Sequence, residues 1–214
     1  QAGCCGALDY HLNQHESGLN YMRRNIDAWW PHVEAGVEAI VITASGCGAT
    51  VKEYGHLLRR DPRYKDKAAR VSTLMRDIAE VVTQERDKLI GLAQAASTSV
   101  KRRLAFHPPC SLQHGLKLRD VVEPLLKAAG FELTYVANAH LCCGSAGTYS
   151  ILQPELSQRL LRNKIDALQA GDADAIVTAN IGCQTHLQSA AQRPVRHWVE
   201  VLEEQLALSA NARA

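Results

Sequence analysis

The sequence predicts an α/β protein made of two tandem, homologous, cysteine-rich repeats. Each repeat is expected to be a small, mostly parallel sheet flanked by helices, and a pseudo-two-fold axis is expected to relate the two. Two observations lead to this prediction. The string Cys-Cys-Gly stands at residues 4–6 and again at 142–144, and a short β-branched run leads to a Gly-Cys pair in each half.

The boundary between the repeats is placed at the only stretch of linker-like composition. That stretch is Ala-Ser-Thr-Ser at residues 96–99, which contains only small and polar side chains. The first repeat is therefore expected at residues 1–99 and the second, complete repeat at residues 100–214.

Composition limits the class of protein. The chain has 214 residues, of which 46% are hydrophobic and 21% are charged, enough to bury one large core or two small ones. The formal net charge is only +2 and the 24 basic residues are scattered, so nucleic acid is not an expected partner. No stretch approaches the roughly 18 consecutive apolar residues of a membrane-spanning helix. Any contact with a membrane is expected to be peripheral.

The first repeat has the signals of an α/β unit. Apolar residues at helical spacing predict a helix over residues 17–34, and the β-branched run at 38–43 predicts a buried parallel strand. A helix at about residues 49–58 is expected next, and residues 68–95 have the amphipathic pattern of one long helix. Cys47 would then lie in a strand-to-helix turn, where backbone N–H groups and the helix dipole favour a thiolate.

The second repeat follows the same plan. Strands are expected at 103–107, 132–137 and 175–179, and helices at about 116–129, at 154–168 and in a C-terminal segment that reaches about residue 208. Pro108 and Pro109 predict a rigid turn that aims Cys110.

Equal spacings relate the two halves. Asn25 and Asn163 each stand 20 residues after the second cysteine of their pair, and each follows an arginine. An Ala-Ile-Val triplet begins eight residues before Cys47 and eight residues before Cys183. We interpret the halves as homologous units and the two Arg-Asn pairs as contacts on the helix surface or between repeats.

The repeats also account for every cysteine. The second repeat has Cys110, Cys142, Cys143 and Cys183, and the first has Cys4, Cys5 and Cys47. The first-repeat counterpart of Cys110 would fall before Gln1, and the chain has no initiator methionine. We therefore expect the chain to be part of a longer polypeptide and the incomplete first set to hold metal poorly.

Four thiolates in one α/β unit leave three explanations open. Structural disulfides are disfavoured because adjacent cysteines pair poorly with each other and an apolar-rich domain does not need them. Zinc accepts four thiolates, but structural zinc sites usually draw them from two Cys-x2-Cys knuckles. An iron-sulfur cluster of the [4Fe-4S] type fits best, because loops at the carboxyl ends of strands can surround a multi-iron core and small residues let backbone N–H groups approach its sulfurs.

The motifs around these cysteines resemble a known family. Together with the segments at 107–114 and 182–186, the Cys-Cys-Gly strings are similar to the cysteine-rich domain family found in heterodisulfide reductase, in anaerobic glycerol-3-phosphate dehydrogenase and in the lactate-utilisation proteins. The stretches at 141–149 and 178–186 resemble in particular the iron-sulfur subunits of bacterial glycolate oxidases. The resemblance covers nearly the whole chain.

This resemblance implies an electron-transfer role. A separate flavin subunit, which holds FAD, is expected to oxidise glycolate to glyoxylate, and this chain to relay the electrons toward a membrane quinone. An upstream ferredoxin-like domain with its own [4Fe-4S] clusters is implied in the same polypeptide. The implied location is cytoplasmic, with peripheral contact to the inner face of the cytoplasmic membrane.

The chain departs from the family pattern at one position of each repeat. In heterodisulfide reductase each repeat ends in Cys-x-x-Cys, but here His186 and Thr50 stand at that spacing after Cys183 and Cys47. A five-cysteine cluster is therefore not expected. His186 and His107 are expected to donate hydrogen bonds beside the metal, with ligation as the alternative.

Two other functions stay open. The thiols would serve a structural metal module, holding zinc or a cluster, that assembles the complex without carrying electrons, or they would form a thiol-disulfide redox site like that of heterodisulfide reductase. The sequence has no nucleophile paired with a base and no phosphate-binding loop, so no catalytic residue is expected in this chain.

Overall fold

The structure is a computed structural model that describes residues 3–94 and 102–211. The fold divides into two compact units, Gln1–Ile78 and Ala79–Ala214. The predicted linker at 96–99 lies outside the described residues, so the repeat boundary at 99/100 stays a prediction. Mixed α/β architecture with parallel sheets flanked by helices is confirmed in both units, and the pseudo-two-fold relation stays a prediction.

The first unit is a helical layer around a two-stranded parallel sheet. Its elements are α1 (Ala7–His11), α2 (His15–Glu34), β1 (Ile40–Ile42), α3 (Ser45–Lys52), α4 (Tyr54–Leu57), α5 (Lys65–Leu74) and β2 (Met75–Asp77). Strands β1 and β2 pair in parallel, with Ile40 opposite Met75. Met22, Ile26 and Tyr54 are fully buried and form the centre of the core. The helix expected at 17–34 is therefore confirmed as α2.

The single long helix expected at 68–95 is wrong. The chain instead forms α5, strand β2, then α6 (Ile78–Gln84) and α7 (Arg86–Gln94). Met75 adopts an extended conformation (φ −60°, ψ 130°) and is fully buried, because its backbone pairs with β1. A strand needs a partner for its N–H and C=O groups, and this requirement overrides the helical propensity of Met-Arg-Asp.

Two further differences concern the segment that carries Cys47. Strand β1 is not deeply buried, since Val41 is 43% exposed. Helix α3 begins at Ser45, four residues earlier than expected. Cys47 therefore lies inside the first turn of the helix, where its thiol is close to the positive end of the helix dipole.

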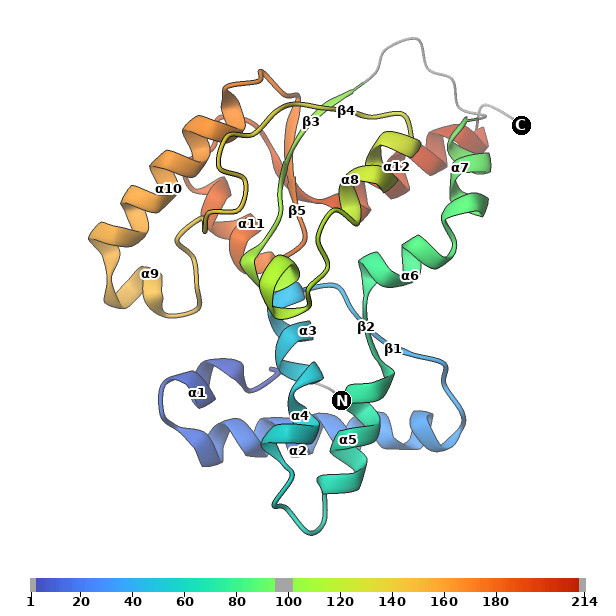
Figure 1. Ribbon diagram of the computed structural model, residues 1–214, viewed down its shortest axis with the longest axis vertical. Coiled ribbons are helices and arrows are strands. Elements are labelled where there is room, and N and C mark those ends of the chain that lie inside the picture. Colours follow the sequence, from blue (N-terminus) through green and yellow to red (C-terminus); the bar gives the residue numbers. More distant parts are fainter. Residues whose placement is uncertain (1–2, 95–101, 212–214) are drawn as a thin grey trace. The chain divides into compact units, whose positions relative to one another are not determined.

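The second unit is a four-stranded parallel sheet covered by helices on both faces (Figure 1). After α6 and α7 come β3 (Arg103–His107), the π-helix η1 (Ser111–Gly115), α8 (Val122–Ala128), β4 (Glu132–Leu133), α9 (Tyr149–Leu152), α10 (Pro154–Gln169), β5 (Ala175–Thr178), α11 (Ile181–Gln188), β6 (Val195–His197) and α12 (Trp198–Asn211). The strand order is β4-β3-β5-β6.

The central strands β3 and β5 are buried on both sides, as their continuous apolar runs predict. Helices α7, α8 and α12 pack together on one face, and α10 and α11 pack on the other (Figure 1). The core beneath α10 includes Cys143 and Cys183 beside Leu161 and Ile176. Two of the predicted metal ligands are therefore part of the hydrophobic core.

Two elements of the second unit are shorter than expected. The helix expected at about 116–129 begins only at Val122, because Lys117 (φ 60°) and Asp120 (φ 54°) take left-handed conformations that no helix accommodates. The strand expected at 132–137 ends at Leu133. The remainder is an irregular segment that leads to Cys142.

The glycine of each Cys-Cys-Gly string is required by backbone geometry. Gly6 has φ +86° and Gly144 has φ +97°, values that L-residues rarely adopt. A Cβ atom at either position would lie 2.5 Å from a helix carbonyl oxygen, that of Gly18 in α2 or of Ser157 in α10. The string therefore marks the point where the cysteine loop lies against a helix.

This contact fixes how α2 and α10 correspond. Gly18 matches Ser157, and seven residues further along each helix Asn25 matches Lys164, both buried. The equal-spacing match of Asn25 with Asn163 is therefore wrong by one residue, since Asn163 is exposed. Asn25 is also not a surface contact, because it is only 1% exposed.

We expect Gly144→Ala to lower the free energy of unfolding of the metal-free, reduced protein by about 2–5 kcal/mol. The left-handed conformation contributes about 1–2 kcal/mol, and the close approach to the Ser157 carbonyl adds about 1–3 kcal/mol of overpacking. Urea denaturation of the variant and of the wild-type protein measures the sum of the two contributions.

The matched control is Gly130→Ala. Gly130 has φ +94° but no atom within 4 Å of a built Cβ, so only the conformational part is expected there. Equal losses in the two variants would contradict the close approach at Gly144.

Candidate metal centre

The four cysteines of the second unit follow the carboxyl ends of parallel strands. Cys110 comes three residues after β3, Cys142 and Cys143 lie between β4 and α9, and Cys183 is the third residue of α11, after β5. Strands β3 and β5 are neighbours in the sheet. After β3 the chain continues to β4 at one edge of the sheet, and after β5 it continues to β6 at the other edge. Such a switch point is where α/β sheets usually bind ligands.

The four sulfur atoms form one continuous set. Hydrogen bonds link Cys110 to Cys142, Cys142 to Cys143, and Cys143 to Cys183. All seven cysteines of the chain lie within the described residues, and all seven are free thiols. The structure thus brings together all four predicted ligands of the second repeat, and their role as ligands stays a prediction.

The thiols alternate between donors and acceptors. Hydrogen bonds from Cys110 and Cys143 lower the pKa of Cys142, and the backbone N–H of Gly144 adds to them at 3.2 Å from the Cys142 Sγ. The pKa of Cys183 is lowered to about 5 by its hydrogen bond with Cys143, against the opposing effect of burial. The donor thiols Cys110 and Cys143 have raised pKa values for the same reason. In the absence of metal, these hydrogen bonds therefore favour ionisation of Cys142 and Cys183 over that of Cys110 and Cys143.

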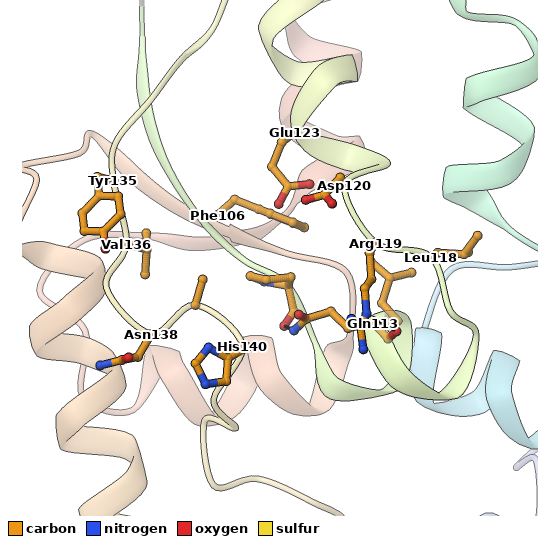
Figure 2. Close-up of a pocket in the computed structure, with 13 residues that line it drawn as sticks. Phe106, Gln113, Leu118, Arg119, Asp120, Glu123, Tyr135, Val136, Asn138 and His140 are labelled. Atoms are coloured by element: carbon orange, nitrogen blue, oxygen red, sulfur yellow. Dashed lines mark hydrogen bonds between the residues drawn. The ribbon is translucent and has the colours of Figure 1, made fainter.

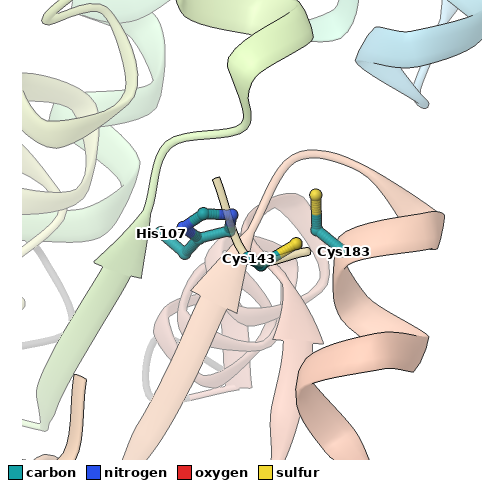
Figure 3. Close-up of side chains that lie close together, drawn as sticks. All are labelled: His107, Cys143 and Cys183. Carbon is teal, nitrogen blue, oxygen red and sulfur yellow. The ribbon is translucent and has the colours of Figure 1, made fainter. Parts of the chain in front are cut away.

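His107, the last residue of β3, is fully buried beside two of these thiols (Figure 3). One of its ring nitrogens and the sulfurs of Cys143 and Cys183 all lie within 4.8 Å of one another. Neither ring nitrogen has a partner at ordinary hydrogen-bond geometry among the residues that the structure describes, and the ring lowers the pKa of the adjacent Cys183 thiol. A buried imidazole without a well-formed hydrogen bond is unfavourable, and a metal or cluster at these sulfurs would supply a better partner for the site. The donor set therefore fits a metal centre.

His186 lies on α11 but outside the group formed by His107, Cys143 and Cys183. Its Nε2 atom is 3.3 Å from the hydroxyl of Ser157, which itself donates to the carbonyl of Gly144 at 2.9 Å. Because the single hydroxyl proton is directed to Gly144, Nε2 of His186 is the donor in this network. His186 thus supports the Cys-Cys-Gly loop through Ser157, and its alternative role as a ligand stays a prediction.

The first unit gathers its thiols in a similar way. Cys5 and Cys47 are hydrogen-bonded, which lowers the pKa of Cys5 to about 6 and raises that of Cys47, while Cys4 is exposed. Asn25 donates to the Cys4 carbonyl at 2.8 Å, and the Tyr54 hydroxyl donates to the Cys5 carbonyl at 2.8 Å. Sequence reasoning missed both supports.

A signal for such supports was present in the apolar pattern. Asn25 stands one residue before the buried Ile26, and Lys164 stands one residue before the buried Ile165. Both polar residues therefore share the inward face of an amphipathic helix, where a polar side chain needs a specific partner. Lys164 was likewise missed.

A cavity of about 460 Å³ borders the segments that carry Cys110 and Cys142 (Figure 2). Gln113 and Arg119 line it on one side, and Asn138 and His140 line it on the other. Glu123 lines the cavity at the top of Figure 2, and burial raises the pKa of its carboxyl group. None of the cysteines is among the residues that line this cavity.

Membrane-spanning segments are not found among the helices of the described ranges, 3–94 and 102–211. This agrees with the sequence, in which no long apolar run occurs.

Comparison with known proteins identifies relatives of the chain. It is 53% identical to the glycolate oxidase iron-sulfur subunit of Escherichia coli (strain K12) over 206 residues, which are 96% of this chain and 49% of that protein. It is 33% identical to the probable glycolate oxidase iron-sulfur subunit of Bacillus subtilis (strain 168), covering 90% of the chain and 42% of the relative. Lactate utilization protein A of Geobacillus thermodenitrificans is 26% identical, with coverages of 93% and 82%.

The chain spans about half the length of the two glycolate oxidase relatives. A family model for the CCG cysteine-rich domain matches residues 1–52 and 104–188. These ranges contain all seven cysteines and both Cys-Cys-Gly strings. The chain belongs to the CCG cysteine-rich domain family.

Proposed function

We propose that this chain is the cysteine-rich part of an iron-sulfur subunit that carries electrons in a glycolate oxidase. The observation that carries the proposal is the set of four free thiols, Cys110, Cys142, Cys143 and Cys183, joined by hydrogen bonds at the carboxyl ends of three parallel strands. The relative with 53% identity bears the name of such a subunit.

The thiols suit a four-thiolate cluster better than any other group. Cys110, Cys142, Cys143 and Cys183 would hold it, and a bound [4Fe-4S] cluster would supply one-electron transfer. Other groups of this chain would contact the sulfurs of the ligands. The Gly144 N–H lies 3.2 Å from the Cys142 Sγ, the Asn180 amide lies 3.7 Å from the Cys183 Sγ, and the buried His107 ring lies nearby. Such contacts to ligand sulfurs tune reduction potentials.

The proposed pathway involves partners outside this chain. A flavin subunit with FAD would oxidise glycolate to glyoxylate, and the electrons would pass through this subunit to a membrane quinone. An upstream ferredoxin-like domain with further [4Fe-4S] clusters would belong to the same polypeptide. We place the assembly in the cytoplasm, in contact with the inner face of the membrane. The absence of a nucleophile-base pair in the sequence supports a relay rather than a substrate-binding role.

A structural metal module is the second candidate. His107, Cys143 and Cys183 have the donor types and the mutual distances, within 4.8 Å, that a single zinc ion would require. This alternative leaves Cys110 and Cys142 without a role, although both are hydrogen-bonded into the same set. We therefore favour the relay.

Cys142→Ser is expected to remove about four iron and four sulfide ions per molecule, together with visible absorption, from the anaerobically reconstituted protein. A serine hydroxyl is a poor substitute for the central thiolate of the set. Iron, sulfide and zinc analysis checks the result.

Cys4→Ser is the matched control, because Cys4 lies in the first unit, is exposed and is not part of the four-thiol set. Its loss should leave the iron of the second unit unchanged. A colourless wild-type protein that holds one equivalent of zinc would overturn the cluster and leave the structural module.

Relay and scaffold differ in what survives loss of a ligand. If the second unit carries electrons, Cys142→Ser should still co-purify with the flavin subunit but should lose glycolate-dependent reduction of a soluble quinone. Pull-down and steady-state turnover on the same preparation measure the two properties. Loss of co-purification, with the remaining clusters unchanged in potential, would favour the scaffold.

A further inference from the structure

A lysine is buried behind the loop that leads to the paired cysteines of the second unit. Lys164, on α10, is only 3% exposed. Its Nζ atom donates to the carbonyl of Asn138 at 2.8 Å and to that of Ala139 at 3.2 Å. These carbonyls stand three and four residues before Cys142, so the lysine holds the approach to the ligand pair.

The charge of Lys164 has no carboxylate to balance it. Within residues 3–94 and 102–211, no Asp or Glu forms an ion pair with its ammonium group. A buried cation without a counter-charge is costly, and burial lowers the pKa of Lys164. This lowering is opposed by the charge of the ionised cysteines, which would be Cys143, Cys110, Cys142 and Cys183 together when the set binds metal.

The first unit shows that the loop can be held without a charge. At the matching position of α2, Asn25 accepts from the N–H of Gly3 at 2.8 Å and donates to the Cys4 carbonyl at 2.8 Å. A neutral amide therefore suffices to fix the segment around Cys4. Burial of an ammonium group costs free energy, and holding the loop does not require a charge. The charge of Lys164 is therefore expected to have a further role.

We propose that Lys164 is the fixed counter-charge of the four-thiolate set and raises the reduction potential of the cluster that the set holds. This inference rests on the proposed function. Reduction adds one electron, and so one negative charge, to a site that already carries four thiolates. A buried cation nearby stabilises the reduced form more than the oxidised form, because Coulomb interactions are strong where water is excluded. Lys164 is a positioning residue that acts through the ligand set.

The test compares variants of the complete, anaerobically purified protein in a redox titration followed by electron paramagnetic resonance. The signal that disappears in Cys142→Ser identifies the cluster of interest. Lys164→Gln removes the charge but keeps a hydrogen-bond donor for the loop carbonyls. The new side chain is a neutral amide, like that of Asn25 in the first unit. We expect its reduced-to-oxidised ratio at a fixed potential to fall about tenfold, equal to a shift of about 59 mV to lower potential.

Two variants separate charge from structure. Lys164→Arg keeps the charge and should stay near the wild-type potential. Arg162→Gln removes one positive charge from an exposed position of the same helix, and water should screen its effect almost completely.

Each outcome decides a different point. An unchanged potential in Lys164→Gln, with full iron content, would overturn the inference and leave the proposed function standing. Equal shifts in Lys164→Gln and Arg162→Gln would also overturn it. Loss of iron in Lys164→Gln but not in Lys164→Arg would support a charge requirement, whereas loss in both would reduce Lys164 to a packing residue. Failure of the wild-type protein to bind iron would overturn the proposed function itself.

Discussion

The second unit depends on holding four ionisable sulfurs in one set, in which each is hydrogen-bonded to the next. Four thiolates at this spacing would repel strongly where two of them, Cys143 and Cys183, lie in the hydrophobic core. Without metal, the set limits this repulsion by sharing protons, with Cys110 and Cys143 donating to Cys142 and Cys183. With metal, the cations replace those protons. The same geometry thus serves both states.

Helix α10 is the element that keeps the loop in place. Near its start, the Ser157 hydroxyl binds the Gly144 carbonyl, and Lys164 binds the carbonyls of Asn138 and Ala139. Ser157 and Lys164 are seven residues apart, about two helical turns or roughly 10 Å. The loop is therefore fastened at two points along one helix face. Gly18 and Asn25 have the same separation on α2, so each unit positions its cysteine pair against a helix in the same way.

The apolar pattern of the sequence predicted the elements whose buried faces are complete within one segment. The other elements depend on pairing with a distant segment. Strand β3 and helices α2 and α10 followed from periodicity, because their apolar faces are complete in sequence. Strand β2 could not be predicted, since Met75 is extended only through its pairing with β1. The cysteine set followed from its spacing, but its supports did not. Equal spacing even misaligned Asn25 with Asn163. The segment from Gly144 to Ser157 is one residue longer than the segment from Gly6 to Gly18, and only the contact of each glycine with its helix reveals this difference.

The same correspondence shows what distinguishes the two units. Their cysteine loops, their left-handed glycines and the spacing of their supports agree, yet one position of the supporting helix is a neutral amide in the first unit and an ammonium in the second. Both side chains hydrogen-bond to the backbone of the segment that carries the cysteine pair, but only Lys164 has a charge. The four-cysteine set of the second unit would then accept an electron more readily than it would with a neutral amide at this position. A single buried charge can therefore change the redox properties of a repeated cysteine motif without any change of fold.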